Sequence, residues 1–151
     1  MRSDRVPGVE RRGTDPDEYL QSLPPEVHDD MVGLDAIITA AMPGRRRVVW
    51  EGTFWGGTQQ TIIGYGDLVQ ERPGGATVEW FVVGLARQKN YFSLYVNATA
   101  AGRYLVADYA GKLGKAKVGS ANVTFKRLAD IDPETMSELV SRAHELAPPD
   151  R

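Results

Sequence analysis

Four strand-like segments follow one another between residues 47 and 97, with only short connections between them. They are rich in β-branched and aromatic residues, and they cover residues 47–55, 60–69, 76–85 and 91–97. The last segment is the clearest, because apolar and polar residues alternate along it. Connections this short join antiparallel neighbours, whereas parallel strands need a long crossover. The centre of the chain therefore predicts an antiparallel meander.

Two helical patterns precede this meander. Thr14 or Asp15 can cap a short helix that runs to about Leu23, with a proline in its first turn. A longer helix follows, because apolar residues recur there with the spacing of a single helix face. These residues are Val27, Met31, Leu34, Ile38 and Ala41. Pro43 and Gly44 end this helix.

Three further elements follow the meander. Thr99 can cap a helix over residues 100–110, with Leu105 and Tyr109 facing the core. Residues 121–126 read as a strand, and Asp132 followed by proline predicts the start of a last helix. Its apolar face comprises Met136, Leu139, Val140, Ala143 and Leu146. The order of elements predicts an α+β fold, with an antiparallel sheet of about five strands and helices packed on one face.

Composition limits the class of protein. We expect residues 1–13 to form a disordered tail and residues 14–148 to form a single domain. The chain has no cysteine, which excludes disulfides, thiolate metal sites and cysteine nucleophiles within it. It has no run of about 18 apolar residues, and its N-terminus lacks the apolar core of a secretory signal. We therefore expect a cytoplasmic protein that is not inserted in a membrane.

Charge is distributed unevenly, although the formal net charge is only −2. Residues 14–35 hold seven acidic groups and no Lys or Arg, whereas residues 84–127 hold eight basic groups and one acid, Asp108. Such asymmetry is found in domains with an anion-binding face opposite an acidic one. Two solvated faces of a small domain would produce the same pattern.

Six short motifs carry a resemblance to a known family. They are the sequences YLQSLPPE at 19–26, AMPG at 41–44, WEG at 50–52, IGYG at 63–66, LARQK at 85–89 leading into FSLY at 92–95, and LGKAKVG at 113–119 continuing through FKRLADID at 125–132. With this order and spacing, residues 15–147 resemble the YdhG-like family of domains of unknown function. The resemblance implies an α+β fold with an antiparallel sheet and no established catalytic residues. One relative is regarded as a frataxin-like iron chaperone. Relatives often have a lysine after the glycine at 119, where this chain has Ser120.

The loop over residues 114–120 has the glycine spacing of a P-loop. It lacks the lysine after the second glycine, and a helix precedes it where a P-loop needs a strand. This excludes a nucleotide triphosphatase site. Lys112, Lys115 and Lys117, together with free glycine amides, could still bind a carboxylate or a phosphate. The alternative is a solvated basic turn.

Two tyrosines stand on the polar side of the clearest strand. Tyr91 and Tyr95 alternate with Phe92, Leu94 and Val96, so they face away from the helices. With Lys89 they could form a polar-aromatic pocket, or they could lie in a subunit interface. A tyrosine face half covered by neighbouring side chains is the simpler alternative.

Several glycines crowd the first two strands, at positions 52, 56, 57, 64 and 66. Glycine in a strand indicates a bulge or a close approach of the backbone to another group. The glycines could leave room for a ligand above the sheet. We favour sheet curvature as their reason.

Other functional classes find little support. His28 and His144 have no partner at metal spacing, and the acidic helix offers only Glu26, Asp29 and Asp30 as oxygen ligands. No Ser-His-Asp set is recognisable. Nucleic acid is an unlikely partner, because the chain is acidic overall and contains no known reading motif.

We therefore predict a small cytoplasmic binding domain that is not an enzyme, has no catalytic residues and needs no cofactor or metal. It binds a small anionic or polar ligand or a protein partner, and it forms a homodimer. The expected ligand-binding residues are Lys89, Tyr91, Tyr95, Lys112, Lys115 and Lys117. The alternative is a frataxin-like iron chaperone, or metal handling through the acidic helices.

Overall fold

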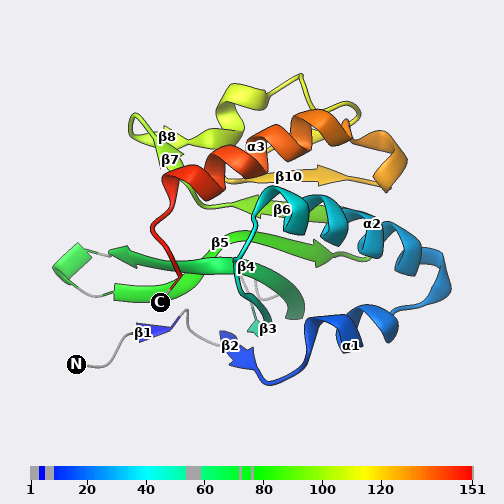
Figure 1. Ribbon diagram of the computed structural model, residues 1–151, viewed down its shortest axis with the longest axis horizontal. Coiled ribbons are helices and arrows are strands. Elements are labelled where there is room, and N and C mark those ends of the chain that lie inside the picture. Colours follow the sequence, from blue (N-terminus) through cyan, green and yellow to red (C-terminus); the bar gives the residue numbers. More distant parts are fainter. Residues whose placement is uncertain (1–3, 6–8, 54–58, 72, 76, 151) are drawn as a thin grey trace.

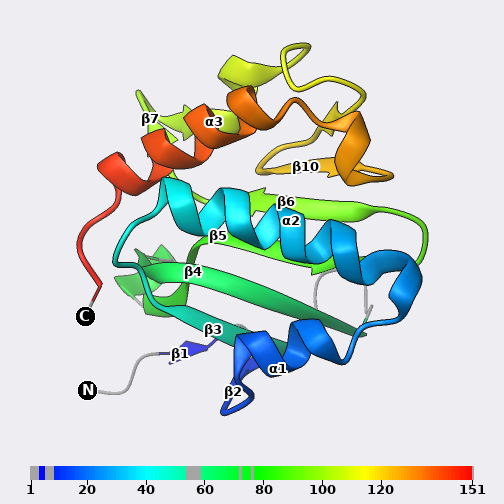
Figure 2. The ribbon, with the colours of Figure 1, turned by 45° about the vertical axis from the view of Figure 1, so that its right-hand side comes forward.

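The computed structural model describes residues 4–5, 9–53, 59–71, 73–75 and 77–150. These residues form an α+β fold in which α-helices cover one face of a mostly antiparallel sheet (Figure 1). Figure 2 shows two of the helices side by side across that face. Among the described helices, none has both the length and the apolar character needed to cross a membrane. The predicted fold class is confirmed.

The main sheet has the strand order β2-β3-β4-β5-β6-β10-β9. The five strands predicted from the sequence are all present, and they form its central part. They are β3 (Arg47–Thr53), β4 (Gln59–Glu71), β5 (Thr77–Arg87), β6 (Phe92–Val96) and β10 (Asn122–Phe125). The pairs along this series are antiparallel, as the short connections predicted. The last member, β9 (Lys117–Val118), adds a short edge to β10.

The described residues of the N-terminal segment, where a disordered tail was expected, contribute two further strands. β1 (Asp4–Arg5) pairs in parallel with β5, and β2 (Val9–Arg12) pairs antiparallel with β3. These strands lie on opposite edges of the β3–β4–β5 unit, and only three residues separate them in the sequence. A linker this short requires the unit to curl until its two edges approach each other.

The helices begin and end near the predicted residues. In α1 (Pro16–Gln21), the side chain of Asp15 accepts a hydrogen bond from the amide of Asp17. α2 covers Pro25–Ala41 and α3 covers Pro133–Leu146, where the Asp132 side chain is the N-cap. The predicted apolar faces are buried, except that Val27 at the start of α2 is half-buried and Leu146 at the end of α3 is 51% exposed. The helix ends before that turn can reach the core.

The predicted helix over residues 100–110 is wrong. The segment forms a hairpin of β7 (Thr99–Ala100) and β8 (Arg103–Tyr104), followed by a 3-10 helix, η3 (Leu105–Tyr109). The hairpin loop consists of Ala101 and Gly102, whose φ angles are 53° and 79°. Positive φ at both loop residues is the geometry of a type I′ turn, which a helix cannot contain. Leu105 and Tyr109 are nevertheless buried, as expected.

The sheet separates two apolar clusters. The larger cluster lies under the helices and includes Leu34 of α2, Leu94 of β6 and Leu139 of α3. The smaller cluster occupies the other face and consists of Trp50, Ile62, Trp80, Phe81 and Ala86. Both strand faces in the β3–β4–β5 unit are therefore packed.

Two glycines make room for this second cluster. Gly64 and Gly84 are Cα partners on β4 and β5. A Cβ atom on Gly64 would lie 2.7 Å from Nε1 of Trp50, and one on Gly84 would lie 2.3 Å from the ring of Phe81. The space above these glycines thus holds the chain's own aromatic rings. Gly56 and Gly57 lie outside the described residues.

Candidate anion-binding site

A hollow of about 310 Å³ lies where the turn between β5 and β6 meets the first turn of α2. These elements come together at the right-hand end of the molecule in Figures 1 and 2. The turn is tight, because the amide of Gln88 donates to the carbonyl of Tyr91 at 2.8 Å. The lining residues are Glu26, Val27, Asp30, Arg87, Gln88, Lys89, Asn90, Tyr91, Phe92, Lys126 and Arg127.

A second hollow, of about 570 Å³, adjoins the first. It lies between the start of β6, the end of β10 and the loop that leads into β9. Its lining residues are Tyr91, Lys115, Ala116, Lys117, Thr124, Phe125, Lys126, Arg127 and Asp130. Tyr91, Lys126 and Arg127 therefore line both hollows. We call the two hollows together the basic pocket.

The register of the sheet explains why the pocket passes from one face to the other. Arg87, Phe92 and Phe125 are Cα partners in one row across β5, β6 and β10. Arg87 is in phase with the buried Leu85, so it points to the helix-covered face. Tyr91 precedes Phe92 by one residue and belongs to the opposite face. The basic pocket thus wraps around the end of the sheet.

Positive charge exceeds negative charge in the basic pocket. Six cationic side chains line it: Arg87, Lys89, Lys115, Lys117, Lys126 and Arg127. Three carboxylates also line it: Glu26, Asp30 and Asp130. The difference is a formal charge of three positive units. Clustered like charges of this kind attract an anion to the surface that carries them.

Two of the three carboxylates already serve the fold. The Asp30 side chain accepts a hydrogen bond from the amide of Leu128 at 3.1 Å, which ties α2 to η4 (Leu128–Asp130). Asp130 lies 3.8 Å from the guanidinium of Arg127, a loose contact with a side chain that is 70% exposed. Neither contact involves a lysine of the pocket.

Arg87 is the least satisfied of the cations. Its Nε is buried and has no hydrogen-bond partner among the residues that the structure describes. It lies near Tyr19 of α1: burial raises the pKa of Tyr19, and the positive charge of Arg87 partly offsets that rise. A buried N–H without an acceptor costs free energy, so an incoming acceptor would be favoured here.

The backbone of the glycine loop offers less to an anion than the sequence suggested. The amides of Lys115, Ala116 and Gly119 donate to backbone carbonyls of the same region at 2.8 to 2.9 Å. Gly114 has φ of 86°, and a Cβ atom there would lie 2.4 Å from the carbonyl oxygen of Asp130. Close backbone packing therefore explains this glycine. Of the glycine amides expected to be free, that of Gly119 is therefore already engaged, and the lysine side chains remain.

Not all of the predicted site residues come together. Lys89 and Tyr91 line the first hollow, and Tyr91, Lys115 and Lys117 line the second. Lys112 is exposed and lines neither hollow.

Tyr95 also lies apart from the basic pocket. It is half-buried against the second apolar cluster, and its hydroxyl donates to Oε1 of Gln60 at 3.2 Å. Burial raises its pKa, and the hydrogen bonds to neighbouring polar side chains partly offset the rise. Tyr95 therefore belongs to the packing of the sheet, as in the simpler alternative above.

The acidic N-terminal helices use several of their carboxylates to hold the fold. Arg47 of β3 contacts Asp35 of α2 at 3.3 Å and Asp17 of α1 at 3.0 Å. The hydroxyl of Tyr65 donates to Asp35 at 2.7 Å, and burial followed by the nearby carboxylate raises the pKa of this tyrosine. Within the described ranges, no group of three or more His, Asp or Glu side chains is arranged to hold a metal ion.

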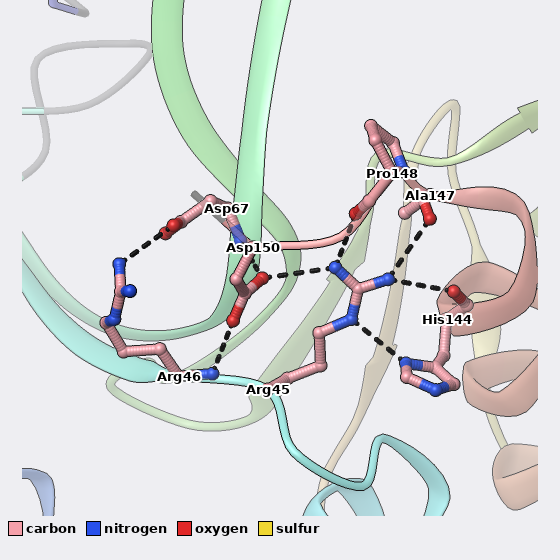
Figure 3. A network of polar contacts seen from close by, with 7 residues as sticks. All are labelled: Arg45, Arg46, Asp67, His144, Ala147, Pro148 and Asp150. Carbon is pink, nitrogen blue, oxygen red and sulfur yellow. Dashed lines mark hydrogen bonds and ion pairs between the residues drawn. The ribbon is translucent and has the colours of Figure 1, made fainter.

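A second polar network fixes the C-terminal segment (Figure 3). All three guanidinium nitrogens of Arg45 donate hydrogen bonds, five in total, to Nδ1 and the carbonyl of His144, to the carbonyls of Ala147 and Pro148, and to the carboxylate of Asp150. The carboxylate of Asp150 also accepts from the amides of Arg46 and Asp67, at 2.7 and 2.8 Å. We call this network the C-terminal anchor.

Charge and burial act in opposite directions on Asp150. Burial favours the neutral acid and raises the pKa, but the hydrogen bonds from two backbone amides and from Arg45 outweigh it together. The pKa of Asp150 is therefore below its ordinary value. Since all five N–H groups of Arg45 have acceptors, its guanidinium has a structural role and no donor left for a ligand.

Sequence reasoning missed three of the pocket's cations, Arg87, Lys126 and Arg127. All three belong to the basic stretch that the sequence singled out, but none was selected from it. One signal was available for Arg87: it continues the alternation of β5 and is in phase with the buried Leu85. An arginine in phase with core residues at the end of a strand is a candidate for a partly buried cation.

The chain has no significant match to a protein-family model, to a curated protein or to a solved structure.

Proposed function

We propose that the protein is a small cytoplasmic binding domain of the YdhG-like type that binds an anionic ligand in the basic pocket and catalyses no reaction. The observation that supports this most directly is Arg87, whose buried Nε has no acceptor among the described residues while it lines a hollow with further cations. A carboxylate or phosphate oxygen would supply that acceptor, and a charge-assisted hydrogen bond of this kind is stronger than a neutral one.

The exposed lysines of the basic pocket also favour an anionic ligand. Lys89, Lys117 and Lys126 are solvent-exposed and surround Tyr91, which is itself 43% exposed. An ammonium group binds phosphate as a point charge, and the ring of Tyr91 offers an apolar surface between the charges. Such a site selects for charge and is screened by salt.

Titration calorimetry with pyrophosphate tests the proposal. Lys126 lines both hollows, so we expect Lys126→Gln to weaken pyrophosphate binding about five- to tenfold, which corresponds to the loss of one charge-assisted contact. Lys112→Gln is the matched control, because Lys112 is an exposed lysine of the same region that lines neither hollow.

Two results would reject the proposal. One is the absence of a binding signal with the native protein at low salt. The other is an equal loss of affinity in the Lys126 and Lys112 variants, because that would indicate attraction to net charge and not to this pocket. The alternative of metal handling has no observation in its favour among the described residues, so we do not take it further.

A further inference from the structure

The basic pocket is divided into two hollows that share a central wall. Arg87 and Lys89 line only the first hollow, and Lys115 and Lys117 line only the second. Tyr91, Lys126 and Arg127 line both and therefore lie between these two pairs of cations. Because Arg87 and Tyr91 belong to opposite faces of the sheet, a ligand that reached both ends would cross the end of the sheet at Tyr91.

We propose that the ligand is a small molecule with two separate anionic groups of the phosphate type, one for each hollow, joined by a segment that crosses Tyr91. This inference rests on the proposed function and adds the class of ligand to it. The first group binds Arg87, and the second binds Lys115 in the loop before β9 and Lys117 at the start of β9.

The two ends differ in the way they recognise an oxyanion. Arg87 is partly buried, and its guanidinium presents a planar set of donors that fits two oxygens of one group. Lys115 and Lys117 are exposed point charges, and the backbone amides at Lys115 and Ala116 are already engaged. The Arg87 end therefore fixes the orientation of the ligand, and the lysine end adds affinity with less directional demand.

The charge of the pocket matches a ligand of this class. Six cations and three carboxylates line the two hollows, so one singly charged group would leave most of the excess positive charge uncompensated. Two phosphate-type groups carry about three to four negative charges at neutral pH. Joining them in one molecule makes the second contact intramolecular, which raises affinity without any new type of contact.

The test compares two series of probes in titration calorimetry: α,ω-alkanediol bisphosphates of increasing chain length and n-alkyl monophosphates of the same lengths. We expect the best bisphosphate to bind about 100-fold more tightly than the monophosphate of equal length. We also expect an optimum length, because a spacer that is too short cannot reach both hollows.

Variants at the two ends identify the contacts. Arg87→Met and the pair Lys115→Gln/Lys117→Gln should each reduce the affinity for the best bisphosphate nearly to that of the monophosphate. Combining them should weaken binding well below the level of the monophosphate, since neither end can then hold a phosphate group. Lys112→Gln is the control and should retain the full advantage of the bisphosphate. Thermal unfolding of each variant checks that it is folded, and Arg87→Lys provides a second variant at that end.

The outcomes separate this inference from the proposed function. If pyrophosphate binding depends on Lys126 but no bisphosphate binds more tightly than its monophosphate, the two-group ligand is wrong and the anion site stands. Insensitivity of the bisphosphate advantage to the Lys115→Gln/Lys117→Gln pair would also overturn it. Tighter binding by an acidic peptide of equal charge would overturn the assignment to a small molecule. If no anion binds, both proposals fail.

Discussion

Two arginines at opposite ends of the molecule illustrate two uses of the same side chain. Arg45 donates five hydrogen bonds and holds the C-terminal segment, and its side chain is 7% exposed. Arg87 has a buried Nε without a partner among the described residues and lines a hollow. A satisfied guanidinium stabilises the fold, whereas an unsatisfied one next to a hollow is available to a ligand. The comparison predicts that the two residues respond differently to the same change.

The largest expected effect is on stability. Arg45→Met removes the donors for three carbonyls, a histidine nitrogen and a carboxylate, and we expect the free energy of unfolding to fall by about 3 kcal/mol. Arg87→Met is the matched variant and should change it by less than about 0.5 kcal/mol, because its Nε makes no hydrogen bond within the part of the chain that the structure describes. Urea unfolding followed by tryptophan fluorescence measures both. Similar losses in the two variants would remove the distinction between the arginines.

The next effect concerns the partner of Arg45. Asp150→Asn keeps the shape of the side chain but removes its charge, so we expect a loss of about 2 kcal/mol at neutral pH. Asp67→Asn is a useful comparison, since Asp67 is a carboxylate of the same network (Figure 3). A loss confined to Asp67→Asn would show that Asp150 is not the carboxylate that holds the anchor.

Acid should abolish the difference in unfolding free energy between the native protein and Asp150→Asn. The pKa of Asp150 in the folded state lies below the ordinary value of 3.8, so the stability that it contributes is fully present above pH 3.8 and is lost as the pH falls through the folded-state pKa. The unfolding free energies of the native protein and of Asp150→Asn should therefore converge below pH 3.8. The subtraction removes the titration of the other carboxylates, which both proteins share.

Raising the ionic strength should affect ligand binding in the basic pocket far more than the stability that the C-terminal anchor provides. The exposed lysines of the basic pocket are screened, so we expect about tenfold weaker pyrophosphate binding when ionic strength rises well above 0.1 M. The stability difference between the native protein and Arg45→Met should change by less than about 0.5 kcal/mol, since that ion pair is largely shielded from solvent. Equal salt sensitivity in both measurements would contradict the contrast between an open site and a closed network.

The smallest effect tests the geometry of Arg87. Arg87→Lys keeps the charge and loses the planar set of donors, so we expect pyrophosphate affinity to fall about threefold. Arg87→Met should lower it about tenfold by comparison. Equal losses would mean that Arg87 acts through its shape alone, and no loss with Arg87→Lys would mean that it acts through its charge alone.

Local patterns allowed much of the fold to be predicted from the sequence. Composition rich in β-branched and aromatic residues, together with alternation in the clearest segment, predicted all five central strands, and the side chains of Asp15 and Asp132 marked two helix starts. The hairpin at 99–104 was missed because an alanine-rich segment favours a helix, whereas Ala101 takes a positive φ in the structure. Here the tertiary fold overrides the local preference.

The site could be predicted only in part, because its residues come from separate elements. The basic stretch drew attention to Lys89, Tyr91, Lys115 and Lys117, which line the two adjoining hollows, but alternation alone could not distinguish the exposed Tyr91 from Tyr95, which packs against the second cluster. No local pattern relates Arg45 to Asp150, which are 105 residues apart. Contacts of that separation depend on the assembled sheet.

That separation has a kinetic consequence for the C-terminal anchor. A contact between residues so far apart requires the chain between them to be ordered first, since closing a long flexible loop costs entropy that a few hydrogen bonds do not offset. We expect the anchor to form after the rate-limiting barrier to folding. Arg45→Met should then accelerate unfolding in stopped-flow measurements and leave the refolding rate nearly unchanged. The last residues of the chain would in that way determine how long the folded state lasts, and not how quickly it is reached.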